Sequence, residues 1–181
     1  DMIQKGIGGK VVRFHVLANS DSEADQTLKL AVRDRVLQEY GDLLETCTSK
    51  EETLAALKNA QQEISETAEA EVLAQGYTYP VRVSLVREEF PFKKYGDLIF
   101  PAGVYDALRI EIGEAKGKNW WCVLYPQMCY VDAAWGYSTE ESHVRLQNTL
   151  TKEEFLVVSA MEQKKVTPKI KCRLVELWSG R

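Results

Sequence analysis

Residues 71–85 read EVLAQGYTYPVRVSL, and the spacing of their apolar side chains changes at Gly76. Before Gly76 the apolar residues recur every three or four positions, as on one face of a helix, and after it they alternate, as along a strand. Glycine also suits the left-handed backbone that often ends a helix. Helical segments followed by strands without intervening helices predict an α+β domain with a mostly antiparallel sheet.

Two helices are predicted between residue 22 and Gly76. The first follows Asn19-Ser20-Asp21-Ser22, which are turn and helix-cap residues, and its apolar stripe consists of Leu28, Val32, Val36, Tyr40 and Leu44. The second begins after Thr48 or Ser49, with an apolar stripe of Leu54, Leu57, Ile64, Ala68 and Val72. The break between them is short, so an antiparallel helical hairpin is expected.

Alternating runs predict the strands. The first, at residues 11–18, places Phe14 and Val16 on one face, and it precedes both helices. Runs at 79–87, 104–112 and 120–125 predict a meander, with a polar and aromatic connection at 88–101. Residues 132–150 are expected to be loop with one short helix. A helix capped by Thr151 and running to about Gln163 is expected next, followed by a last strand at 169–178. The first and last strands are expected to join the sheet. The glycine-rich residues 1–9 are expected to be a flexible lead, and residues 10–181 a single domain.

The composition is that of an ordinary globular protein, with 45% hydrophobic and 28% charged residues. The net charge is −4, and the basic residues are scattered among acids, which argues against a nucleic-acid partner. The glycine run at residues 6–9 precedes a predicted strand instead of following one, so it lacks the setting of a phosphate-binding loop. No cofactor and no small-molecule substrate are expected.

Candidate catalytic groups are few. His15, Ser20 and Asp21 are triad residue types, but Ser20 and Asp21 are better explained as a turn that caps a helix. Cys122 lies in an apolar strand, which favours an inert buried sulfur over a nucleophile. The chain has four cysteines, which permit two bridges or free buried thiols, and their spacing does not suit zinc: Cys47, Cys122, Cys129 and Cys172. We expect no catalytic residue and no metal site.

Two groups of motifs resemble a known family. Residues 13–22 read RFHVLANSDS, and Asp25-Gln26, Leu28-Lys29 and Val32-Arg33-Asp34 follow them. The second group consists of Phe90-Pro91, Lys94-Tyr95-Gly96, Pro101-Ala102-Gly103, Tyr105, Asn119-Trp120-Trp121-Cys122-Val123 and the residues from Pro126 to Cys129. From about residue 10 to 130 the chain resembles the stage II sporulation protein R family.

The resemblance implies both a role and a place. Proteins of this family are exported from the forespore into the space between the septal membranes. There they activate the membrane-embedded aspartic protease of stage II sporulation, which then processes the precursor of the mother-cell sigma factor E. The export or anchoring segment of the family is expected to be absent from this chain. Export also implies an oxidising compartment, where a bridge between Cys122 and Cys129 is expected.

The resemblance implies a signalling protein that acts by binding, not an enzyme. The alternative is a cell-wall-directed hydrolase in the same compartment, which would need His15 in a cleft beside a second ionisable group. Under the binding hypothesis, the expected contact residues are Arg13, His15, Asn19, Asp21 and Lys29 of the first motif, with the aromatic residues Phe90, Tyr95, Tyr105 and Trp120. The competing structural account has Asp21 capping a helix, Arg13 pairing with an acid such as Glu111, and the aromatic residues forming a satellite core.

Overall fold

The helical hairpin is present as α2 (Glu23–Glu45) and α3 (Lys50–Ala74) in the computed structural model, which describes residues 2–129 and 140–160. Ser22 and Ser49 precede the two helices, and each accepts a hydrogen bond from the backbone N–H three residues later. Gly76 ends α3 with a φ of +86°. The N–H groups of Gly76 and the next residue close the last turn, as in a Schellman motif. Local cap chemistry therefore sets three of the four ends of the hairpin.

A four-stranded sheet lies against this hairpin in the order β2-β5-β1-β6. Strand β5 (Gly103–Ile112) pairs antiparallel with β2 (Val81–Phe90) and parallel with β1 (Val12–Leu17), and β1 pairs antiparallel with β6 (Asn119–Tyr125). The α+β prediction is confirmed, and the sheet is mixed because β1 runs parallel to β5. The first strand joins the sheet at its centre, while the strand expected at 169–178 lies outside the described residues.

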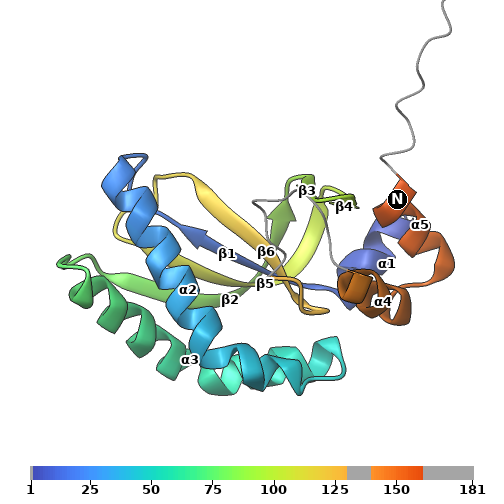
Figure 1. The fold of residues 1–181 in the computed structure, drawn as a ribbon, viewed down its shortest axis with the longest axis horizontal. Helices are drawn as coiled ribbons and strands as arrows, with labels where there is room; N and C mark the ends of the chain where they lie inside the picture. The colour runs from blue at the N-terminus through green and yellow to red at the C-terminus, as the bar shows by residue number, and fades with distance from the viewer. Residues whose placement is uncertain (1, 130–139, 161–181) are drawn as a thin grey trace, which may run out of the picture.

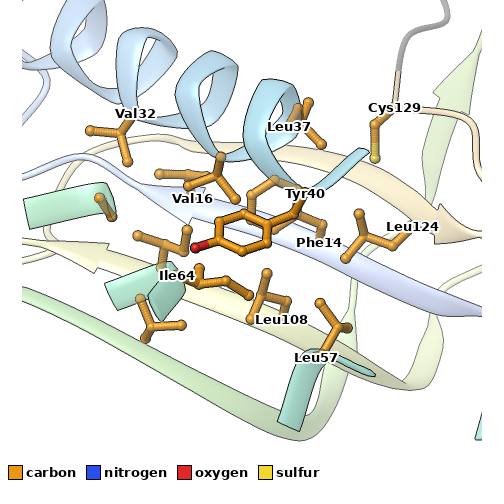
Figure 2. Packing of buried hydrophobic residues seen from close by; sticks show 14 of the residues in the cluster. Phe14, Val16, Val32, Leu37, Tyr40, Leu57, Ile64, Leu108, Leu124 and Cys129 are labelled. Carbon is orange, nitrogen blue, oxygen red and sulfur yellow. The ribbon is translucent and has the colours of Figure 1, made fainter. Parts of the chain in front are cut away.

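Figure 1 shows α2 and α3 crossing one side of the sheet, while the remaining helices gather at its other end. The main core lies between the sheet and the hairpin. In Figure 2, Tyr40 points from α2 towards this core, among Phe14 and Val16 of β1 and Ile64 of α3. All five residues expected to face the sheet from α2 are buried, as the fourfold spacing predicts.

The aromatic connection contains a short hairpin of β3 (Lys93–Tyr95) and β4 (Leu98–Phe100), which Gly96 turns with a φ of +61°. It contributes to a second buried cluster, which draws residues from the helices at the end of the sheet: Ile7, Val11, Phe90, Leu98, Phe100, Tyr105, Ala107, Val123, Met128, Leu146, Leu150 and Val158. The side of the sheet opposite α2 and α3 is thus packed at one end by this second core.

Residues 2–10 correct the sequence prediction of a flexible lead, because they form helix α1 (Met2–Lys10) with Ile7 fully buried. Gly8 lies so close to the Val104 carbonyl that a Cβ atom could not fit. Lys50 donates a 2.9 Å hydrogen bond to the Gly8 carbonyl. Glycine lowers helix propensity and so hid the helix, but here it permits close packing on β5.

Two further helices complete the described chain. Helix α4 (Glu140–Thr149) is a short helix within residues 132–150, as expected. Helix α5 (Lys152–Ala160) follows Thr151, the predicted cap residue, and its expected end at about Gln163 lies outside the described residues. Thr151 and Glu154 each accept a hydrogen bond from the other's backbone N–H, at 3.2 and 2.8 Å, so they form a capping box. Within residues 2–129 and 140–160, no helix has the length and apolar character needed to cross a bilayer.

Candidate functional site

Alternate side chains of a strand point to opposite faces of a sheet, and the face turned away from α2 and α3 carries the candidate site. One line of residues in register crosses all four strands on this face. Ser84 of β2 lies opposite Arg109 of β5, which lies opposite His15 of β1, which lies opposite Trp121 of β6. We call these four residues the cross-strand row.

Charged side chains link the row to its neighbours. Arg109 Nη1 donates to Glu88 Oε2 at 3.0 Å, and its Nε lies 3.6 Å from Glu111 Oε2. Glu111 also lies 3.5 Å from Nη1 of Arg82, a side chain that is 77% exposed. Ion pairs this accessible to water contribute little stability individually. Their main effect is to hold two guanidinium groups and two carboxylates across a half-buried face.

His15 is almost completely buried, with 3% of its surface exposed. Its ring stacks on Trp121 at a centroid distance of 4.8 Å and contacts Phe90 at 5.1 Å. Burial, and to a smaller extent the positive charges of Arg109 and Arg13, lower the pKa of His15 to about 4. Nε2 is 2.7 Å from Glu88 Oε1, but the two groups are not aligned for a hydrogen bond, and Arg109 already engages this carboxylate. The imidazole is therefore neutral at pH 7.

This arrangement does not resemble a nucleophile with its base. Ser84 lies two strands from His15, roughly 10 Å away at the usual strand spacing, and Arg109 stands between them. A base with a pKa of about 4 is also poorly matched to proton transfer near pH 7. In the described part of the chain, no group of three or more His, Cys, Asp or Glu side chains could hold a metal ion.

Arg13 is fully buried beside the row, in a cage of aromatic rings. Its Nε donates to the Cys122 carbonyl at 3.2 Å and its Nη2 to the Tyr95 hydroxyl at 2.8 Å. The guanidinium carbon lies 4.9 to 5.7 Å from the ring centroids of Phe90, Tyr95, Phe100 and Tyr105. No carboxylate among the described residues pairs with Arg13, so the expected pairing with Glu111 is wrong.

The remaining polar residues of the first motif form a different site. Asn19 Oδ1 accepts from the Glu114 N–H at 2.9 Å, and Asp21 Oδ1 accepts from the Lys118 N–H at 2.7 Å. Lys29 donates to the Lys118 carbonyl at 3.0 Å. These bonds fasten the β1–α2 loop to the turn between β5 and β6. Asp21 therefore binds this turn and does not cap α2, contrary to the structural account.

The two other members of the supposed triad are similarly engaged. Ser20 donates a 2.6 Å hydrogen bond to Asp25, and Asn19 donates a second one at 2.8 Å. These two bonds lower the pKa of the Asp25 carboxyl. With Asp21 bound to the turn, neither Ser20 nor Asp21 is directed towards His15, so the simpler explanation as a turn holds.

Two glycines that the sequence reasoning overlooked make this site possible. Gly113 has a φ of +59°, and a Cβ atom there would collide with the side chain of Asn19. A Cβ atom on Gly117 would collide with the carbonyl of Ser20. The available signal was a pair of glycines between the strands predicted at 104–112 and 120–125, because such glycines often mark a close approach of backbone.

The aromatic residues expected at a partner surface fall into two groups. Phe90, Tyr95 and Tyr105 surround Arg13, and the Tyr105 hydroxyl donates to the Pro101 carbonyl at 2.7 Å. Trp120 lies on the opposite face, where its ring meets Phe14 edge-on at 5.6 Å. The guanidinium of Arg33 covers it at 4.8 Å. Among the nine expected contact residues, only His15 belongs to the cross-strand row.

The predicted bridge between Cys122 and Cys129 is present, with their Cα atoms 5.2 Å apart. Cys47 is free and partly buried. Cys172 lies outside the described residues. The bridge closes the turn after β6 and places Met128 in the second core.

The fold is that of a single-domain α+β protein, and two of its polar candidates, Arg13 and His15, lie on one face of the sheet. The family model described as Stage II sporulation protein R matches residues 8–135. The protein of that name from Bacillus subtilis (strain 168) is 32% identical over 180 aligned residues, covering 94% of this chain and 80% of the relative. The chain belongs to the stage II sporulation protein R family. No solved structure matches it.

Proposed function

We propose that this chain is an exported sporulation signal that acts by binding and activating the membrane-embedded aspartic protease of stage II sporulation. In this proposal the chain is exported from the forespore and meets the protease in the space between the septal membranes. The activated protease then cleaves the precursor of sigma factor E in the mother cell. Membership of the family supports the sporulation role, and the similarity to the Bacillus subtilis protein extends over most of both chains.

The observation that most supports this proposal is the set of side chains on the sheet face turned away from α2 and α3. It combines guanidinium groups and a tryptophan, residue types that are enriched at protein interfaces, with carboxylates that pair with the guanidinium groups, and it lacks the paired nucleophile and base of a hydrolase. The observation that favours the hydrolase alternative is the 2.7 Å approach of His15 to Glu88. Two observations oppose this alternative. The pKa of His15 is about 4, and Arg109 lies between His15 and Ser84, the serine of the row.

The proposal is tested by reconstituting the protease and the sigma factor precursor in lipid vesicles, then adding the purified chain. Precursor cleavage is expected only when the chain is present, and vesicles that receive buffer without the chain serve as the control. A parallel assay follows the release of soluble fragments from purified cell wall. Precursor cleavage at the same rate with and without the chain would refute the proposed activation. Saturable release of wall fragments would establish the hydrolase alternative.

A further inference from the structure

We propose that the cross-strand row is the surface that meets the partner, and that it binds an extended protein segment carrying a carboxylate side chain. Arg82, Glu88 and Glu111 flank the row and complete this surface. The inference rests on the proposed function and deepens it, because it assigns the contact to one face and states the chemistry of the bound segment.

The first observation is the distribution of polar atoms that lack hydrogen-bond partners. Nine such buried side-chain atoms occur in the described chain, and four of them belong to partly exposed side chains on this one face: Oγ of Ser84, Oε1 of Glu88, Nε of Arg109 and Oδ1 of Asn119. Native proteins pair nearly all buried polar atoms, because an unpaired one costs about 1–3 kcal/mol. The four atoms mark this face as one where hydrogen bonding within the described chain is incomplete.

The second observation is the chemistry that these atoms offer. The side chains of Arg109 and Glu88 are each 28% exposed, so this face offers both a guanidinium donor and a carboxylate acceptor, and Ser84 lies beside Arg109 across β2 and β5. An extended peptide presents both carbonyl acceptors and N–H donors along its length. A carboxylate on such a segment would also match the guanidinium groups of Arg82 and Arg109, because the planar fork of arginine binds carboxylates in two parallel bonds.

The local charge favours an acidic segment. The whole chain has a net charge of −4, whereas this face carries Arg82, Arg109 and Lys93 against Glu88 and Glu111. Arg82 is the most accessible of these groups, at 77% exposed, and its single carboxylate contact is long. It is therefore available to a partner at small cost. Trp121 is half-buried at the end of the row and supplies an aromatic contact of the kind that dominates interface energies.

An anionic lipid surface is a poorer match for this face. Glu88 and Glu111 would repel lipid phosphates, and Arg109 is only 28% exposed, so it cannot reach a flat surface. Membrane-binding proteins instead present clusters of exposed basic side chains. A protein segment can enter between the flanking side chains and pair with both the arginines and the glutamates of this face.

The test compares three single variants in the vesicle assay, with binding measured by co-sedimentation. Arg82→Glu reverses the exposed charge, and Ser84→Asp places a carboxylate where the segment would put its own. Lys58→Glu makes the same charge change as Arg82→Glu on the exposed side of α3 and serves as the matched control. Arg82→Glu and Ser84→Asp are expected to weaken binding to protease vesicles at least 10-fold, while Lys58→Glu stays within 2-fold. Urea unfolding of each variant confirms that it remains folded.

Two results would overturn the assignment while leaving the proposed function intact. One is that the wild-type chain activates the protease and Arg82→Glu and Ser84→Asp bind it as tightly as the control. The other is that all three variants lose binding equally, which indicates an effect of net charge alone. Equal binding to vesicles without protease would favour the lipid surface and also overturn it. If the wild-type chain binds through the row but triggers no cleavage, the proposed activation is wrong and the assignment of the contact surface is kept. If the wild-type chain does not bind the protease at all, both proposals are wrong.

Discussion

Nη2 of Arg13 donates a 2.8 Å hydrogen bond to the hydroxyl of Tyr95, so a guanidinium on a central strand holds a hairpin that lies outside the main sheet. A buried charge without a carboxylate partner is expensive unless hydrogen bonds and polarisable groups replace water. The Cys122 carbonyl and four aromatic rings provide that replacement here. Arg13 is thus part of the second core, although it occupies the motif that suggested recognition.

The hydrogen bond between Arg13 and Tyr95 predicts that substitution of either residue lowers the stability. Tyr95→Phe removes a hydrogen bond to a charged group and is expected to lower the free energy of unfolding by about 1–3 kcal/mol. Arg13→Ala also empties the cage and is expected to cost more than about 3 kcal/mol. Urea unfolding measures both, and Tyr77→Phe is the control because no hydrogen bond of its hydroxyl occurs among the described residues. An Arg13→Ala variant that keeps wild-type stability but fails to activate the protease would restore Arg13 as a contact residue.

Burial of His15 predicts a loss of stability in mild acid. The pKa of His15 is about 4 in the folded chain and 6.5 in the unfolded one, so the unfolded chain takes up the proton first as the pH falls. The stability is complete above about pH 6.5 and declines as the pH falls through 4, by at most about 3.4 kcal/mol. Urea unfolding between pH 7 and 5 should detect most of this decline, since the Asp and Glu side chains of an unfolded chain titrate mainly below about 4.5.

The matched variant for this prediction is His15→Phe, which keeps an aromatic ring against Trp121 but cannot take up a proton. Its unfolding free energy should change less between pH 7 and 5 than that of the wild-type chain. Identical pH profiles for the two proteins would show that His15 titrates normally and that other groups govern the acid response.

Three glycines predict three different outcomes when each is changed to alanine. Gly113→Ala should cost about 3 kcal/mol or more, because it combines a left-handed backbone with a collision at Asn19. Gly76→Ala has the same backbone strain but open space around it, so about 1–2 kcal/mol is expected. Gly9→Ala lies in α1 with no neighbour within 4 Å and should stabilise the chain by up to about 1 kcal/mol. Thermal unfolding of the three proteins tests this order, and equal costs at Gly76 and Gly113 would contradict the close approach of Asn19.

The Cys122–Cys129 bridge predicts a dependence on redox conditions. It closes a short loop, so reduction is expected to lower the free energy of unfolding by about 2–3 kcal/mol through the added freedom of the unfolded chain. Unfolding in urea with and without a reductant measures this difference. The double variant Cys122→Ala/Cys129→Ala should be insensitive to the reductant, whereas Cys47→Ser should respond as the wild-type chain does. A similar response from the double variant would mean that another thiol is responsible.

The features that the sequence predicted well depend on neighbours along the chain. Ser22, Ser49 and Gly76 act on backbone groups within a few residues, so their roles are visible in local patterns. Helix α1 was not predicted because its glycines lower helix propensity, and the contact that Gly8 makes possible is with Val104, which lies far along the sequence. The cross-strand row was not predicted either, for a related reason. His15, Ser84 and Arg109 become neighbours only through strand pairings, one of them parallel, that alternation does not specify.

The parallel pairing of β1 with β5 also affects how the chain acquires its fold. Val12 is made early, but its partner Asp106 follows only after both long helices and β2 have been synthesised. Pairings between such distant residues must overcome a large loop-closure entropy and tend to make folding slow. During synthesis the helical hairpin can form early, yet the apolar side that it turns to β1 has no completed sheet to cover until β5 and β6 emerge. A nascent chain of this protein is therefore expected to collapse around its two helices first and to gain its sheet last.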